Sequence, residues 1–558
     1  MRRRVSSAGF RACLGLLAVL LAVPAVAQPR TEIRISESSS DMAAISADNI
    51  AALLRQGQQL EQQRRWGEAL AHYENAIRQY PNEGSLQQRF DTARLHYDLE
   101  RRYTDRSFCD SVVRLSTQRA LDLYGQVLLK IDSHYVEAPR WKELVDRGTT
   151  NLDLALSERT FVDRNVPQRN RPAIDAFRRE LRTAIDGKVV NSRADARDAV
   201  AAAAGLAQQR LDITAAAVVL EYLCGATNAL DPYSTYLTPD QLNDVYAQIE
   251  GNFVGLGVEL KAQDGGLAIV RVISGSPAEE AGIRAGDRIL AVNGRSTKDL
   301  STDQAAAMLQ GAEGSVVALA VAAPGQSQRQ VSVRRRRVDV PSIDQVHIID
   351  SQNGIGYFKL TCFQKTTARD LDTALWKLHH EGMKSLVIDV RGNPGGLLVS
   401  AVEVADRFVE RGVIVSTRGR STQEDFTYTA HEQAKWQMPL AVIIDQDSAS
   451  AAEIFAGAIR DHHRGKIVGV QSFGKGSVQG IFPLEECNAG VRLTTAKFYS
   501  PNGQPYNHVG VEPDIKVQPT KVQLTARPVD GKLPGSGDPM LTAAMQALTP
   551  TLQARSGL

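Results

Sequence analysis

The chain has 558 residues, of which 43% are hydrophobic and 23% are charged, and its formal net charge is +2. This length corresponds to about three or four ordinary domains, and the composition is that of a soluble globular protein. Four positive charges lie near the start of the chain, so the remainder is slightly negative: Arg2, Arg3, Arg4 and Arg11. This balance argues against a nucleic-acid partner.

Residues 1–27 have the pattern of a secretory signal peptide. A basic start precedes an apolar stretch from Cys13 to Val23, and Ala25-Val26-Ala27 then forms an AxA cleavage pattern before Gln28. The apolar stretch is short for a membrane span, and no later run approaches the length of about 18 apolar residues that a span needs. We therefore expect an exported protein in the periplasm or cell envelope of a bacterium, with no transmembrane segment in the mature chain.

The cysteines and histidines predict no metal site and no cofactor. The four cysteines after the signal peptide are widely spaced, so pairing in an oxidising compartment stays open and no pair is identified: Cys109, Cys224, Cys362 and Cys487. Neither a CxxC nor an HExxH pattern is present, and these are the common signatures of zinc sites.

A polar, Ser-rich linker is expected over residues 28–48, followed by a helical region over residues 49–225. Residues 50–83 fit one tetratricopeptide-like repeat, and a plain helical hairpin is the alternative. Either would be a packing or docking module without catalytic residues. An adaptor docking on the repeat and a homodimer both stay open. The residues at the repeat spacing are Gly57, Leu60, Ala69, Tyr73, Ala76 and Pro81.

The segment Asp447–Gln479 is predicted to place a serine at a helix start and a lysine on a turn. The apolar run Leu440–Ile444 predicts a buried strand, and helical spacing of apolar residues begins near Ser450. A second apolar run, Ile467–Val470, predicts another strand and leads into Phe473-Gly474-Lys475-Gly476. Ser450 is thus expected at a helix N-terminus and Lys475 on a glycine-flanked turn.

This arrangement allows serine–lysine catalysis. A serine hydroxyl needs a base to take its proton, and a lysine can do so once burial lowers its pKa. The N–H of Ala451 is expected in the first helical turn, where the helix dipole would help it to donate to a developing oxyanion. The alternative is that Ser450 and Glu453 form only a capping box and that Lys475 is a surface lysine. The pair alone does not decide between them.

The pattern SASAAEI followed by FGKG resembles the carboxyl-terminal processing (tail-specific) serine peptidase family, and the resemblance extends over roughly residues 225–517. It implies that Ser450 is the nucleophile, that Lys475 is the general base, and that Gln479 holds Lys475. Residues 159–207, rich first in Arg and then in Ala, do not match the family and are expected to be an insertion.

A glycine-rich turn follows the predicted strand Ser385–Val390 and reads DVRGNPGG over residues 389–396. Such a turn exposes backbone N–H groups, as an oxyanion hole requires. The resemblance implies that it supplies one oxyanion donor. We assign that donor to Gly396, with Gly395 as a near competitor, and the second donor to Ala451.

Residues 245–337 resemble a PDZ domain. Four segments occur in the expected order: GLGVEL from 255, SPAEEAGI from 276, GDRILAVNG from 286 with a type I′ turn at its end, and a groove helix over Asp303–Leu309. PDZ domains add an extended peptide to a sheet edge and capture its terminal carboxylate on backbone N–H groups. The residues expected to bind an apolar C-terminus are Gly255, Leu256, Gly257, Val258, Ala305 and Met308.

Residues 338–520 alternate strands and helices, which predicts an α/β core. The resemblance implies a serine peptidase core of the Clp-protease/crotonase type, with Leu493–Tyr499 in an edge strand against which substrate lies. Residues 521–558 are expected to be a tail, a linker followed by a short docking helix, without an assigned function. The whole chain is thus expected to be a multidomain α+β protein.

These expectations combine into an exported serine endopeptidase. It would recognise apolar C-termini of protein or peptide substrates through its PDZ domain and cleave with a Ser-Lys dyad supported by Gln. The alternative is a non-catalytic exported scaffold in which the PDZ domain and the repeat bind partners. An acyl-CoA enzyme of the crotonase type fits by analogy of fold alone.

Overall fold

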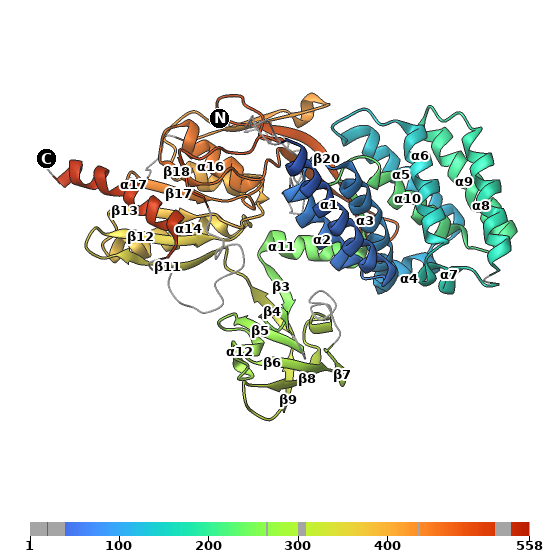
Figure 1. Cartoon of the computed structure of the whole chain (residues 1–558), viewed down its shortest axis with the longest axis horizontal. Coiled ribbons are helices and arrows are strands. Elements are labelled where there is room, and N and C mark those ends of the chain that lie inside the picture. Colours follow the sequence, from blue (N-terminus) through green and yellow to red (C-terminus); the bar gives the residue numbers. More distant parts are fainter. Residues whose placement is uncertain are drawn as a thin grey trace, which may run out of the picture. The chain divides into compact units, whose positions relative to one another are not determined.

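The computed structural model shown in Figure 1 describes residues 19–20, 39–168, 170–263, 266–298, 308–431, 436–518 and 537–556. The predicted signal peptide lies outside these residues except for strand β1 (Val19–Leu20). The chain divides into two compact units: the first comprises residues 1–240, 417–426 and 477–498, and the second comprises the rest. Within the described ranges, no helix is both long enough and apolar enough to cross a membrane.

The first unit is built mainly from helices, drawn from blue to green in Figure 1. Their bounds are α1 (Ser39–Gln62), α2 (Trp66–Gln79), α3 (Gly84–Thr104), α4 (Arg106–Arg114), α5 (Thr117–His134), α6 (Trp141–Ala155), α7 (Arg159–Asn165), α8 (Arg171–Asp186), α9 (Arg193–Leu211) and α10 (Ala215–Asn228). This confirms the helical region expected from the sequence.

Helix α1 begins at Ser39, so the linker predicted over residues 28–48 is wrong for its second half. That segment contains three alanines and a methionine, which favour a helix, and no proline or glycine interrupts it, although its Ser and Asp residues suggested a linker. Residues 28–38 lie outside the described ranges.

Helices α1 and α2 form the predicted hairpin. Ala69, Tyr73 and Ala76 are buried in it, and a Cβ added to Gly57 would lie 2.2 Å from the Tyr73 ring. Glycine is therefore required at position 57 for the two helices to approach. Whether the hairpin is a tetratricopeptide repeat stays a prediction.

The expected insertion over residues 159–207 forms α7, α8 and most of α9. Phe161, Phe177 and Ala203 of these helices are buried in the same hydrophobic core as α5, α6 and α10. The segment is therefore an integral layer of the helical unit.

A sheet with the strand order β16-β15-β20-β19 follows the helices, and β2 also pairs with β20. The predicted edge position of Leu493–Tyr499 is wrong, because these residues belong to β20, which lies between β15 and β19. Strands β19 and β20 form an antiparallel hairpin, so β19 occupies one side of β20. The bounds are β2 (Thr235–Leu237), β15 (Val413–Gly419), η1 (Thr422–Glu424), β16 (Phe426–Thr429), β19 (Ser477–Leu484) and β20 (Ala489–Tyr499).

The second unit begins within α11 (Pro239–Glu250) and continues into the PDZ region. Its antiparallel sheet has the order β4-β5-β6-β8-β9, with β7 beside β6, while β3 pairs with β10. Asn293 and Gly294 have φ of 50° and 80°, which confirms the predicted type I′ turn. The bounds are β3 (Asn252–Gly255), β4 (Val258–Gln263), β5 (Gly266–Val272), α12 (Pro277–Glu280), β6 (Arg288–Val292), β7 (Arg295–Ser296), β8 (Val316–Ala322), β9 (Arg329–Arg334) and β10 (Arg336–Asp339).

The α/β core has a sheet of order β11-β12-β13-β17-β18-β21, parallel from β12 onward. The predicted strand Leu440–Ile444 is confirmed to the residue as β17. The remaining bounds are β11 (Ile343–Asp350), β12 (Ile355–Leu360), α14 (Thr367–His380), β13 (Ser385–Asp389), β14 (Gly396–Leu397), α15 (Leu398–Asp406), α16 (Ala451–Asp461), β18 (Lys466–Gly469), β21 (Ile515–Lys516) and α17 (Pro539–Ser556).

Candidate active site

Ser450 lies between β17 and α16, at the start of the helix as predicted. Its φ of 63° and ψ of −114° form a conformation that non-glycine residues rarely adopt. The side chain is buried, and its hydroxyl has no hydrogen-bond partner among the residues that the structure describes. A strained turn from a parallel strand into a helix is typical of a serine nucleophile.

The Glu453 carboxylate joins the serine segment to the lysine segment. It accepts hydrogen bonds from the Ser450 N–H (2.6 Å), the Ser472 hydroxyl (2.6 Å), the Gly474 N–H (2.6 Å) and the Lys475 N–H (2.9 Å). The Ser450 and Lys475 amides donate to the same oxygen, Oε2. The backbones at these two positions therefore lie close together.

This geometry bears on the capping-box alternative. Glu453 does cap the Ser450 N–H, but the Glu453 N–H donates to the Ser450 carbonyl oxygen (2.9 Å), and no side-chain hydrogen bond from Ser450 caps the helix.

Burial raises the pKa of Glu453, while the four donors act in the opposite direction. The sequence reasoning treated Glu453 only as a capping residue; its signal was a lone carboxylate in the apolar run from Ala451 to Ile459.

Lys475 is 1% exposed, so it is not the surface lysine of the alternative reading. The turn around it depends on glycine: Gly474 has φ 90°, and a Cβ on Gly476 would lie 2.1 Å from the Asn507 backbone nitrogen. Tight packing against residues 507–509 thus fixes the backbone of the lysine turn.

Gln479 belongs to the first unit, on β19, whereas Ser450 and Lys475 belong to the second. Within its own unit the Gln479 side chain is buried, and its Nε2 donates to the Ser477 hydroxyl (2.9 Å). Its Oε1 is without a hydrogen-bond partner in the described part of the chain. The part assigned to Gln479 in the triad stays a prediction.

The glycine-rich loop at 392–396 packs directly on Ser450. A Cβ on Gly395 would lie 2.8 Å from the Ser450 Cβ, and Gly395 and Gly396 both have positive φ. The Gly395 N–H donates to Asn393 Oδ1 (2.8 Å), which favours Gly396 over Gly395 as the oxyanion donor. The assignment of Gly396 and Ala451 stays a prediction.

Asn393 is a positioning residue that the sequence reasoning did not single out. Its Nδ2 donates to the Leu360 carbonyl oxygen (2.9 Å), and its own carbonyl accepts from the Ala449 N–H (3.0 Å). Asn393 therefore connects the loop to the residue before the serine. Its place inside the RGNPGG motif was the available signal.

The predicted PDZ residues fall at the start of the PDZ sheet. The carbonyl groups of Leu256 and Gly257 accept from the Ala278 and Ile273 N–H groups. Gly257 has φ 81°, and a Cβ there would lie 2.3 Å from Ser276, so glycine is required. Gly255 ends β3, Val258 begins β4, and Met308 packs against the domain core. Ala305 and most of the groove helix lie outside the described residues, and peptide binding here stays a prediction.

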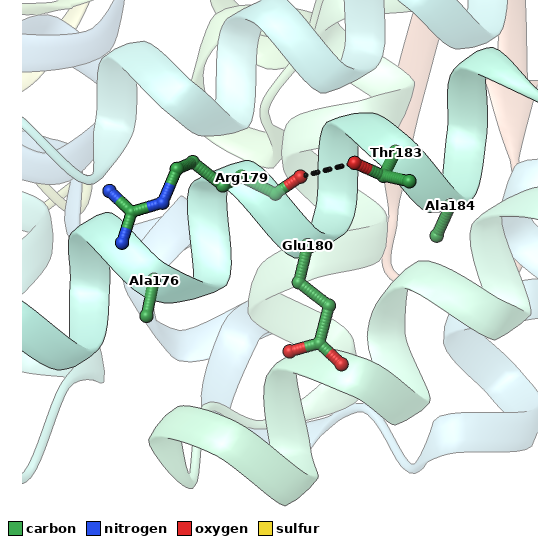
Figure 2. Close-up of a pocket in the computed structure, with 5 residues that line it drawn as sticks. All are labelled: Ala176, Arg179, Glu180, Thr183 and Ala184. Carbon is green, nitrogen blue, oxygen red and sulfur yellow. Dashed lines mark hydrogen bonds between the residues drawn. The ribbon is translucent and has the colours of Figure 1, made fainter.

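Figure 2 shows a different feature, an open groove of about 550 Å³ on α8. The Thr183 hydroxyl donates to the Arg179 carbonyl oxygen there, and Arg210 pairs with Glu180. None of the predicted catalytic residues lines this groove. Its residues are Ala176, Arg179, Glu180, Thr183 and Ala184.

The parallel core sheet and the antiparallel PDZ-like domain that precedes it define an α/β protein with a PDZ domain. Comparison with known proteins supports both assignments. Residues 354–517 match the family model of peptidase family S41, and residues 269–322 match a PDZ domain. The carboxy-terminal-processing protease of Bartonella bacilliformis is 36% identical over 300 residues, which cover 53% of this chain and 68% of that protein. The chain therefore belongs to peptidase family S41, among the carboxy-terminal-processing proteases.

Two further similarities complete the comparison. A probable CtpA-like serine protease of Staphylococcus haemolyticus is 32% identical over 303 residues, 54% of this chain and 60% of that protein. The solved photosystem II D1 C-terminal processing protease is 25% identical and covers 72% of this chain and 95% of that chain, with a TM-score of 0.39. The chain spans 60% and 68% of the lengths of the two curated relatives named here.

Proposed function

We propose that the protein is an exported serine endopeptidase of the periplasm or cell envelope. In this proposal the PDZ domain binds the apolar C-terminus of a protein substrate and presents the chain to Ser450 and Lys475. A homodimer and an adaptor on the helical hairpin belong to the same proposal. No cofactor is required by the chemistry below.

One observation carries the proposal: a buried serine hydroxyl that has no hydrogen-bond partner in the described part of the chain, on a strained turn, beside a glycine loop and next to the backbone of a buried lysine. A capping serine would have its hydroxyl bonded to the helix. A lysine without a chemical role is rarely buried, because burial disfavours its charged form. The scaffold alternative gives no reason for this arrangement.

The proposed reaction follows ordinary acyl transfer. The Ser450 Oγ attacks the scissile carbonyl carbon while the neutral Lys475 amine takes the hydroxyl proton. The N–H groups of Ala451 and Gly396 stabilise the oxyanion, and the loss of one such donor typically costs about 10²- to 10³-fold in kcat. Lys475 then gives the proton to the leaving amine and activates the water that hydrolyses the acyl-enzyme. We assign to Gln479 Oε1 the task of accepting a hydrogen bond from the Lys475 amine.

Digestion of an unstructured protein with an apolar C-terminus tests the proposal. Wild type is expected to cleave it, while Ser450→Ala and Lys475→Ala are expected to be inactive. A substrate whose tail ends in charged residues is expected to be cleaved more slowly, because it lacks the PDZ ligand. Cleavage by both variants at the wild-type rate would exclude the dyad, and indifference to the tail would exclude the PDZ role.

A further inference from the structure

Arg391, at the start of the loop that packs on Ser450, is held between two carboxylates. Its Nε lies 3.0 Å from both oxygens of Asp389, and its Nη2 lies 2.6 Å from Asp389 Oδ2 and 2.8 Å from Asp538 Oδ2. Asp389 also accepts from the Tyr357 hydroxyl (3.0 Å). The three charged side chains are at most 18% exposed, so water screens their attraction poorly.

Asp538 connects this network to the last helix of the chain. Its Oδ1 accepts from the N–H groups of Met540 and Leu541 (3.0 and 3.1 Å) and caps α17, with Pro539 at the first helical position. Its Oδ2 contacts Arg391. One carboxylate therefore both begins the helix and holds the loop.

Packing on the core sheet fixes the position of α17 independently of the ion pair. Figure 1 shows α17, in red, lying across β13 and β17. Burial of large apolar side chains is a main favourable contribution to such packing. The predicted tail is thus part of the core sheet's packing, although it lies beyond residue 517, where the family match ends. The buried residues of α17 are Met540, Leu541, Ala544 and Leu548.

We propose that Asp538 is a positioning residue for the oxyanion loop. By holding Arg391 it fixes the N-terminal end of the loop, as Asn393 fixes the middle, and so keeps the Gly396 N–H directed at the developing charge. Gly392, Gly395 and Gly396 of the loop all have positive φ. At its C-terminal end the loop is held by backbone pairing of Gly395 and Gly396 with Phe363. At its N-terminal end the N–H groups of Arg391 and Gly392 donate to carboxylate side chains, so this end depends on side-chain contacts. The inference rests on the proposed function and extends it to α17.

The test is Asp538→Asn, which keeps a good helix cap and removes the charge. The substitution makes the loop that carries the Gly396 N–H less rigid but does not remove this donor. We therefore expect kcat to fall roughly three- to tenfold, with KM within about twofold of wild type. Asp538→Glu is expected to restore part of the loss. The matched control is Asp372→Asn, which breaks another ion pair of the same unit, with Arg407, at 2.9 Å; its kcat is expected to equal that of wild type.

A second control separates positioning from stability. Leu548→Ala removes packing of α17 and leaves the Asp538–Arg391 contact in place, so it is expected to lower the melting temperature without lowering kcat at a temperature where it stays folded. Hydrogen exchange of the peptide covering 391–397 gives a readout without catalysis, and Asp538→Asn is expected to exchange faster there than Asp372→Asn.

The outcomes distinguish the two proposals. Equal kcat and equal loop exchange in Asp538→Asn and Asp372→Asn would overturn the positioning role while leaving the peptidase proposal intact, provided that wild type cleaves and Ser450→Ala does not. A wild-type protein that fails to cleave would refute the proposed function, and the exchange data would still decide whether Asp538 orders the loop.

Discussion

The two units of the molecule each bury a glutamate completely, and the two carboxylates have different neighbours. In the helical unit, Glu221 accepts from the Arg102 guanidinium (3.0 Å), the Tyr103 hydroxyl (2.9 Å) and the Asn151 amide (2.6 Å). In the α/β core, Glu453 is bonded to three backbone N–H groups and one hydroxyl.

The difference shows what each carboxylate does. Glu221 neutralises a buried cation and connects α3, α6 and α10, so its contribution is to the stability of the helical unit. The described hydrogen bonds of Glu453 come from neutral groups, and they fix the turns that carry the serine and the lysine. A buried glutamate thus stabilises the fold in the helical unit, whereas in the α/β core it fixes the backbone around the candidate active site.

The same substitution at both positions gives the sharpest contrast, and Glu453→Gln has the larger expected effect on activity. Glutamine offers one acceptor oxygen in place of two and turns an NH₂ group toward N–H donors. Each lost charge-assisted bond costs about 1.5–3 kcal/mol, so we expect at least about a 100-fold loss of kcat/KM. Steady-state cleavage of the apolar-tailed substrate measures it. Activity close to that of wild type would show that Glu453 is only a helix cap.

Glu221→Gln is expected to act on stability alone. It leaves the Arg102 guanidinium buried beside an uncharged partner, and breaking a buried pair in this way costs about 3–5 kcal/mol. The melting temperature should fall, while kcat/KM per folded molecule stays within about twofold of wild type. A loss of activity in protein shown by circular dichroism to be folded would contradict the division of roles.

The smallest expected effect is a pH dependence of stability at Glu453. Its pKa is raised by burial, so between the ordinary pKa of 4.5 and the raised value the folded chain holds a proton that the unfolded chain has released. This group therefore contributes stability at low pH that is lost as the pH rises through the folded pKa. The melting temperature of wild type minus that of Glu453→Gln should decrease with rising pH in this window. A difference that increases would mean that the folded pKa is lowered.

Local patterns predicted the elements around the site well. The apolar run at Leu440–Ile444 and the helical spacing after Ser450 both depend on neighbouring residues, and the structure has a strand and a helix there. The capping pattern was also present, but the sequence does not show where a hydroxyl points. Only the structure shows that the Ser450 hydroxyl has no hydrogen-bond partner among the described residues.

Contacts between distant segments were not predictable in the same way. The Arg391–Asp538 pair joins residues on either side of the whole serine and lysine region, and nothing in the local sequence of the tail indicates its partner. The edge position expected for Leu493–Tyr499 failed for the same reason, because the order of strands in a sheet depends on tertiary pairing.

Covalent labelling with a serine-reactive fluorophosphonate, followed by peptide mass spectrometry, tests directly whether Lys475 activates Ser450. We expect a single label on Ser450 in wild type and in Lys466→Ala, which removes an exposed lysine from β18, and almost none in Lys475→Ala. Equal labelling of wild type and Lys475→Ala, or a label on a different serine, would contradict this expectation.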